Sequence, residues 1–224
     1  MSASRETASH IADSLKSEML SGDLAPGQRL GEAALAERFS VSRGPIRDAL
    51  SRLVEIGIAV SVPNVGTRVR EFTQSEAREL YELRETLEAE AAGLAARRSN
   101  QVEKDALVSL TYVSEDRFGP GGQGTDNDFH LELARMSGNG LLLRLLSEQL
   151  YPQLMLLRIH SRNATGRLGK ALNEHHGICD AVVSGDPELA SILMRRHVQN
   201  SWKSFCDRMD YAGAAPKTKQ GQLT

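Results

Sequence analysis

The stretch from residue 32 to residue 56 constrains the fold most, because it places two helical segments on either side of a very tight break. The letters EAALAERF predict a short helix, which Ser40 and Val41 then interrupt. Ser42 stands where a residue caps the next helix, which we expect to run to about Ile56. Two helices joined so closely predict a helix-turn-helix.

The segments on either side extend this unit. Residues 8–20 carry apolar side chains at helical spacing, which predicts a preceding helix. Two β-prone runs follow, Ile58 to Val62 and Thr67 to Val69, around a Pro-Asn-Val-Gly turn, and these predict a hairpin. The order helix, helix, tight turn, helix, hairpin is that of a winged helix-turn-helix, which we place over residues 8–72.

Arg43 and Arg47 lie four residues apart at the start of the helix that follows the tight break. Positions four apart project from the same face of a helix. In a helix-turn-helix this end enters the major groove, where the planar fork of arginine pairs with guanine or holds phosphate. For an isolated pair of arginines, an ordinary solvated helix face is the alternative. The wing tip, Asn64 to Thr67, would lie beside the adjacent minor groove.

The charge distribution is uneven along the chain. The net charge is −2, which argues against a protein that binds nucleic acid through positive charge spread over its whole surface. Between Arg29 and Arg70 there are seven arginines against four acidic residues, so 7 minus 4 gives a local charge of +3. This excess fits either a solvated surface or a phosphate-binding one until it is placed on a fold.

Neither a membrane span nor a secretory signal is expected. No apolar run approaches the length needed to cross a bilayer, and the N-terminal residues lack a basic segment followed by a hydrophobic run. We therefore expect a cytoplasmic protein with no membrane partner.

From Thr73 onward the pattern is helical nearly throughout, so the predicted fold is mainly α, with an all-α helical bundle over residues 73–211. Thr73 with Glu76 forms a capping box at its first helix. We expect a flexible connection at residues 118–125 and a disordered tail at residues 212–224. Further helices are expected to begin near Asn100 and to cover residues 126–137, 139–160 with a kink at Pro152, 168–184 and 187–210.

Three histidines fall on apolar helix faces in this second domain. His130 shares a face with Asp126, four residues earlier, and His175 and His197 lie on apolar stripes of two later helices. A carboxylate and three imidazoles that converge in a helical bundle would make a divalent metal site. From spacing alone, histidines that are satisfied within the core remain the alternative.

The first domain resembles the DNA-binding domain of the GntR family of bacterial transcription regulators. The likeness rests on ALAERFSVSRGPIRDALSRLVEIGI, with LAPGQRL before it and VPNVGTRV after it, and covers about residues 8–70. It departs from the family pattern at Gly31, where a capping residue is common, and at Ala33, where some members carry another DNA-contacting arginine. The resemblance implies that operator DNA is contacted mainly by Arg43 and Arg47, assisted by Ser42, Gly44, Asn64 and Gly66.

Residues 75–210 resemble the all-helical effector-binding domain of the FadR branch of that family. Its metal-binding members carry D-x-x-x-H, then EH-x-x-I, then a histidine on the last helix, and this chain matches each motif in order. The resemblance implies a site that holds zinc, nickel, manganese or iron, and a small carboxylate effector that chelates the metal. The implied ligands are Asp126, His130, His175 and His197.

Two further positions match the effector-binding domain of the family. Arg84 is implied to pair with the effector, although a surface arginine paired with Glu88 is the alternative. Asn139 is also implied to bind the effector, and capping its own helix is the alternative.

Together the two resemblances imply a regulator, not an enzyme, that binds a roughly palindromic operator as a homodimer and is released from it by its effector. Two other interpretations stay open. The second domain would be a metal-dependent hydrolase if a base such as Glu174 faced the metal. In the other interpretation the protein is a regulator without metal, which binds a larger ligand such as an acyl thioester among its helices.

Overall fold

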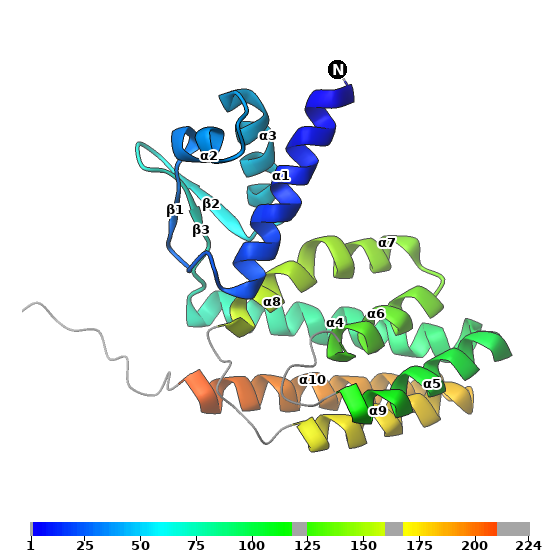
Figure 1. Ribbon diagram of the computed structural model, residues 1–224. Coiled ribbons are helices and arrows are strands. Elements are labelled where there is room, and N and C mark those ends of the chain that lie inside the picture. Colours follow the sequence, from blue (N-terminus) through cyan, green and yellow to red (C-terminus); the bar gives the residue numbers. More distant parts are fainter. Residues whose placement is uncertain (1, 118–124, 160–167, 210–224) are drawn as a thin grey trace, which may run out of the picture.

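The computed structural model describes residues 2–117, 125–159 and 168–209. In the described part of the chain, a small winged-helix domain lies against one side of a larger helical domain (Figure 1). The glycine-rich residues 118–124 and the tail at residues 212–224 lie outside the described residues, as does His160. No helix of the described residues is both long and apolar enough to cross a membrane.

The winged-helix domain has the element order that the sequence predicted, with one additional strand. Its elements are α1 (Ser2–Ser21), β1 (Arg29–Leu30), α2 (Glu32–Arg38), α3 (Arg43–Glu55), β2 (Ala59–Val62) and β3 (Gly66–Val69). The three strands form an antiparallel sheet in the order β1-β3-β2, in which Arg29 pairs with Arg68 and Ala59 with Val69. The additional strand, β1, was not predicted because it has only two residues and pairs with a strand far along the chain.

The core of this domain lies between α1, α3 and the sheet. Its fully buried side chains include Ile11, Leu15, Ile46, Leu53 and Ile58. Burial of each such side chain stabilises the fold by about 1.5–3 kcal/mol. Because the core fixes one face of α3, the opposite face of that helix is held toward solvent.

The helical domain is built around two long antiparallel-packed elements, α4 (Gln74–Arg98) and α10 (Pro187–Met209). The remaining elements cover them: α5 (Gln101–Arg117), α6 (Thr125–Met136), α7 (Gly140–Arg144), the π-helical turn η1 (Leu145–Leu150), α8 (Tyr151–Ile159) and α9 (Leu168–Val183). A single apolar core joins these helices.

The start of α4 confirms the predicted capping box. The Thr73 hydroxyl accepts from the amide of Glu76, and the Glu76 carboxylate accepts from the amide of Thr73. The Thr73 amide, together with Arg70 at 2.8 Å, lowers the pKa of Glu76 to about 2. The same carboxylate thus caps α4 and ties it to the residue that follows β3.

Near Pro152 the structure shows a π-helical turn where the sequence predicted a kink in one continuous helix. Pro152 has no amide proton to donate to the preceding turn. The six-residue turn η1 ends two residues before this proline and accommodates the missing donor with i→i+5 bonding. The backbone stays helical through this turn and continues as α8 from Tyr151.

Candidate metal centre and DNA-binding face

The start of α3 presents its polar residues to solvent. Ser42 occupies the N-cap position, and Arg43, Gly44 and Arg47 are exposed beside it, while Ile46 is fully buried on the opposite face. Ser42 makes no side-chain capping bond, so the amides of the first turn of α3 gain no acceptor from its hydroxyl. This end of α3 therefore offers two guanidinium groups and helix-terminal amides on one exposed surface.

Arg47 is held in place by a neighbouring helix. Its Nε donates to Glu32 at 2.7 Å, and both side chains remain substantially exposed. Such a surface pair is weak, on the order of 0–1 kcal/mol, and exchanges readily for a phosphate contact. Gly44 has open space around it, since a Cβ at that position would meet nothing within 4 Å. Packing within the described residues gives no reason for a glycine there.

The wing turn carries Asn64 and Gly66 in left-handed conformations. Their φ angles are +59° and +97°, and both residues are exposed. Asparagine and glycine adopt this region at the lowest cost, which explains how the Pro-Asn-Val-Gly sequence closes the hairpin. The wing tip is thus an exposed projection beside the face of α3.

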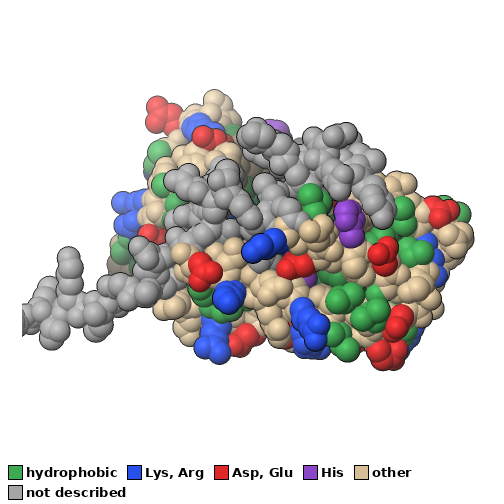
Figure 2. Space-filling model, turned by 90° about the horizontal axis from the view of Figure 1, so that it is seen from below, with side chains coloured by type: hydrophobic (Ala, Val, Ile, Leu, Met, Phe, Trp, Pro, Cys, Tyr) green, Lys and Arg blue, Asp and Glu red, His purple; other side chains and the backbone are tan. Residues whose placement is uncertain are grey.

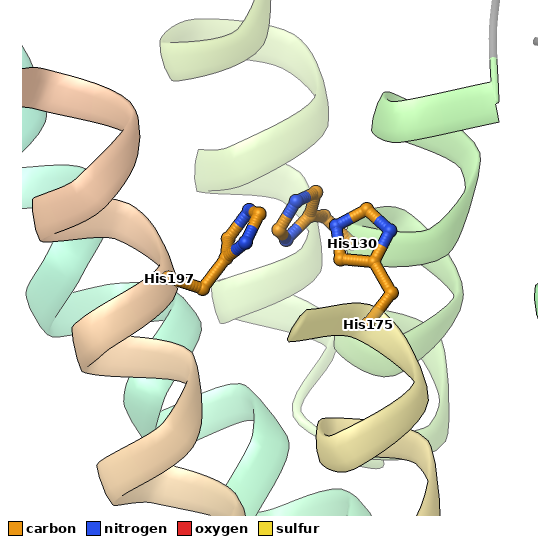
Figure 3. Close-up of side chains that lie close together, drawn as sticks. All are labelled: His130, His175 and His197. Carbon is orange, nitrogen blue, oxygen red and sulfur yellow. The ribbon is translucent and has the colours of Figure 1, made fainter. Parts of the chain in front are cut away.

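The second candidate site is a cluster of three buried histidines in the helical domain. His130 comes from α6, His175 from α9 and His197 from α10, and each is at most 2% exposed. Figure 3 shows the three rings gathered in the space between these helices. Their centroids are 4.7 to 5.2 Å apart, and one nitrogen of each ring lies within 4.8 Å of the corresponding nitrogens of the others.

These distances fit a metal ion. Ligands at metal–nitrogen distances of about 2.0–2.1 Å lie roughly 3 to 3.5 Å from each other, so the triad has to close by little more than an ångström. Three imidazoles from three different helices are a ligand set suited to zinc, nickel, manganese or iron. The sequence also predicted Asp126, which lies in the first turn of α6, but its side chain lies outside the described part of the chain.

Two of the three histidines have a carboxylate at the nitrogen on the far side of the ring. His197 Nδ1 is 2.7 Å from Glu174, and His130 Nδ1 is 2.9 Å from Glu88. A carboxylate at Nδ1 favours the tautomer whose lone pair is on Nε2, and metal-binding histidines almost always donate their other ring N–H to a carboxylate, a backbone carbonyl or water. His175 is oriented differently, by stacking on Phe129 at 4.2 Å between ring centroids.

Arg84 is buried, which corrects the surface position that the sequence analysis considered for it. It is 0% exposed, and its Nε donates to Glu88 at 2.7 Å. Its Nη2 lies 3.0 Å from His130 Nε2. Because arginine can only donate, His130 Nε2 accepts, which is the same tautomer that the carboxylate of Glu88 favours.

Glu88 joins these groups into one buried network. Its Oε1 accepts from both Arg84 and the hydroxyl of Tyr151, the latter at 2.6 Å. Burial by itself raises the pKa of Glu88, but Arg84 and His130 together hold it below the usual value of 4.5. The carboxylate therefore stays ionised although it is fully enclosed.

Asn139 has a structural role that needs no ligand. Its exposed side chain accepts from the amide of Leu142 and caps α7, which is the alternative that the sequence analysis left open. The structure therefore does not place it with the triad.

Both carboxylate oxygens of Glu174 are engaged by neighbouring side chains. One contacts His197 Nδ1 and the other accepts from Asn200. The carboxylate therefore supports the His197 ring from its Nδ1 side.

Sequence reasoning did not identify Glu88, Tyr151 or Glu174 as supports of the triad. Arg84 and Glu88 are four apart, a spacing that also describes ordinary surface pairs such as Arg78–Glu82 on the same helix. Tyr151 lies 63 residues from its partner Glu88. The only sequence signal for Glu174 was its position directly before His175.

Comparison with known proteins identifies both domains. Residues 7–69 match the family described as bacterial regulatory proteins, gntR family, and residues 79–200 match the FCD domain. LutR of Bacillus subtilis (strain 168), an HTH-type transcriptional regulator, is 30% identical over 205 residues, which cover 80% of this chain and 92% of LutR. The probable D-xylose utilization operon transcriptional repressor of Paenarthrobacter nicotinovorans is 29% identical over 194 residues, or 85% of each chain.

Solved structures share the fold over nearly the whole chain. E. coli McbR/YncC superposes with a TM-score of 0.75 at 21% identity and covers 91% of this chain and 98% of its own. A putative transcriptional regulator GntR from Rhodococcus sp. RHA1 gives a TM-score of 0.71 at 25% identity, with coverage of 89% and 97%. The chain therefore belongs to the GntR family of bacterial transcription regulators, with a winged helix joined to an FCD domain as in the FadR branch, and it is a DNA-binding regulator, not an enzyme.

Proposed function

We propose that this regulator binds operator DNA as a homodimer and that a small organic acid, held at a divalent metal in the FCD domain, controls that binding. The observation that carries the proposal is the buried triad of His130, His175 and His197, two of whose rings are backed by carboxylates. Metal-binding histidines almost always donate their other ring N–H to a carboxylate, a backbone carbonyl or water, and His130 and His197 each have such a carboxylate at Nδ1.

The DNA-binding half of the proposal rests on the exposed end of α3. We assign base and phosphate contacts to Arg43 and Arg47, and supporting contacts to Ser42, Gly44 and the wing residues Asn64 and Gly66. The open space around Gly44 suits close approach of a phosphate to the helix-terminal amides. By contrast, the face of the molecule in Figure 2 intermixes acidic and basic side chains, which does not suit a DNA surface.

The proposal that a small organic acid binds at the metal is supported by the position of Arg84. A metal would take the Nε2 lone pair of His130, which at present accepts from Arg84 Nη2. The guanidinium group would then need another acceptor, and a carboxylate of the effector supplies one. The metal, when bound, contributes electrostatic attraction for the same anion, and Asp126 is the proposed fourth protein ligand. Glu88 keeps the positive charge of Arg84 balanced inside the core.

Control of DNA binding is a matter of linkage. The effector changes operator affinity only to the extent that it binds the DNA-competent and DNA-incompetent arrangements with different affinities. Release from DNA on effector binding is the outcome we expect.

The test uses a DNA duplex that the protein itself selects from a random library. Fluorescence anisotropy would follow binding of this duplex by zinc-loaded protein during titration with a panel of small mono-, di- and hydroxycarboxylic acids. We expect at least one acid to weaken binding about 10-fold or more, within the usual range of coupling between sites. The double variant His175→Ala, His197→Ala should bind the duplex but lose this response.

A matched control removes a histidine next to the triad. His176 follows His175 on α9 and is half-buried, but it is not one of the three gathered imidazoles. His176→Ala should keep the full response to the acid. An equal response in the double variant would contradict the metal site, and a response only to a coenzyme A thioester would favour the larger-ligand alternative.

A further inference from the structure

Helix α8 belongs to both domains of the protein. Leu154 and Leu157 are buried in the core of the helical domain, whereas Leu156, between them, is fully buried in the core of the winged-helix domain. α8 also packs against α1 (Figure 1). A movement of this helix relative to the helical domain therefore displaces a core residue of the DNA-binding domain.

A second contact places α8 against the end of α3, the proposed recognition helix of the DNA-binding domain. The Gln153 side chain lies so close to Gly57 that a Cβ on this glycine would be 2.6 Å from Gln153 Cδ. Gly57 has a φ of +77° and connects α3 to β2. The side chains of α8 thus touch the link between the recognition helix and the wing.

The first residue of α8 reaches the metal site. The Tyr151 hydroxyl donates to Glu88 Oε1 at 2.6 Å, and Glu88 Oε2 lies 2.9 Å from His130 Nδ1. Tyr151, Glu88 and His130 are all at most 2% exposed. Two short polar contacts therefore connect an imidazole of the triad to the helix that enters the DNA-binding domain.

We propose that Tyr151 is a positioning residue that transmits the state of the metal site to the DNA-binding domain through α8. This inference rests on the proposed function of the triad. A metal held by His130, His175 and His197 would supply an attraction that brings the three rings closer together. Glu88 follows the Nδ1 side of the ring, and Tyr151 follows Glu88. The packed core does not deform continuously, so α8 shifts as a unit against Gly57 and the Leu156 pocket.

The π-helical turn before Tyr151 suits this role. Turns of this type interrupt regular i→i+4 bonding and occur frequently at functional sites. η1 lies between α7, which the Asn139 side chain caps, and α8. In this proposal the π turn serves as the joint at which α8 moves, and Tyr151 is its contact with Glu88.

Hydrogen–deuterium exchange of the full chain, with and without zinc, tests this coupling. The peptides of interest cover residues 53–60, at the Gly57 link, and residues 151–158, in α8. In the unmodified protein we expect zinc to change exchange in both segments by about fivefold or more, the lower end of ordinary coupling between sites. Tyr151→Phe should take up the same amount of zinc, while its zinc-dependent change at residues 53–60 falls below about twofold.

Two further variants separate transmission from general loss of stability. Tyr81→Phe removes the hydroxyl of another buried tyrosine, which packs on Trp202 and Phe205 in the same core, and should keep the full zinc effect. Gln153→Ala leaves the Tyr151–Glu88 bond in place, so it should keep the effect in α8 and reduce it at residues 53–60. Thermal melting would verify that each variant is folded.

The outcomes distinguish this inference from the function on which it rests. A full zinc effect at residues 53–60 in Tyr151→Phe would overturn the proposed role of Tyr151, and a full effect there in Gln153→Ala as well would overturn the coupling through α8. Zinc uptake by the unmodified protein without any change at residues 53–60 would also overturn it and would leave the metal site intact. No zinc uptake by the unmodified protein would overturn the proposed function and this inference with it.

Discussion

Replacing Arg84 by alanine is expected to lower the free energy of unfolding by about 3–5 kcal/mol, because it leaves the carboxylate of Glu88 buried without its counter-charge. The side chains of this pair are 0% and 1% exposed, so bulk solvent does not reach the Glu88 carboxylate to stabilise its charge. Urea-induced unfolding at pH 7 measures the loss. Such a change is a large fraction of the total stability of an ordinary domain.

The same helix provides a matched control. Arg78 and Glu82 have the same spacing and a 2.9 Å contact, but their side chains are 70% and 63% exposed. Arg78→Ala should therefore cost only about 0–1 kcal/mol. Equal costs for the two substitutions would contradict the buried network. Replacement of both partners, Arg84→Met with Glu88→Leu, should cost less than Arg84→Ala alone, since no buried charge is then left unpaired.

This network also predicts a dependence on pH. The folded-state pKa of Glu88 is lowered, so the ionised carboxylate contributes stability above its unfolded value of 4.5 and loses it as the pH falls below that value. The destabilisation caused by Glu88→Gln should therefore be largest at neutral pH and should shrink in acid. A difference that stayed constant from pH 7 down to the acid limit of folding would contradict an ionised Glu88.

Arg43→Ala and Arg47→Ala are each expected to weaken binding of the selected duplex by about 1–3 kcal/mol, or roughly 5- to 150-fold. If one arginine reads a base, its loss relaxes the sequence preference at one position. If it holds phosphate, its loss weakens binding to all sequences alike and reduces the salt dependence. Anisotropy titrations at several salt concentrations, with duplexes altered one position at a time, separate these two roles.

Arg52→Ala is the matched control for these arginines. Arg52 lies in the last turn of the same helix, so the substitution removes the same charge at the end away from the predicted groove. It should change affinity much less than either of the other two. An equal loss from Arg52→Ala would show that general positive charge on α3, not contact by its N-terminal end, accounts for binding.

The parts of the fold that the sequence predicted depend on local physics. Apolar periodicity and capping groups determine where helices such as α4 begin and which face they bury. The capping box of Thr73 and Glu76 could therefore be predicted from the sequence. The same periodicity placed His175 and His197 toward the core. Their mutual approach was not a consequence of periodicity, which identifies a buried face but not the neighbouring helix that covers it.

The parts that were missed depend on contacts distant in sequence. A charged side chain is normally expected at the surface, and the burial of Arg84 becomes understandable only with Glu88, Tyr151 and His130 around it. The strand β1 exists because two residues pair with a strand nearly forty positions later, not because their own sequence favours it. The position of α8, which contributes side chains to the cores of both domains, likewise depends on how the two domains pack.

The proposed metal site is tested by the metal content of the purified protein. The same measurement is made on the double variant His175→Ala, His197→Ala and on the control His176→Ala. We predict about one divalent transition metal per chain in the unmodified protein and in the control, and loss of the metal from the double variant. Absence of metal from the unmodified protein, even after incubation with zinc, nickel or manganese, would contradict this prediction, and the histidines would then be structural.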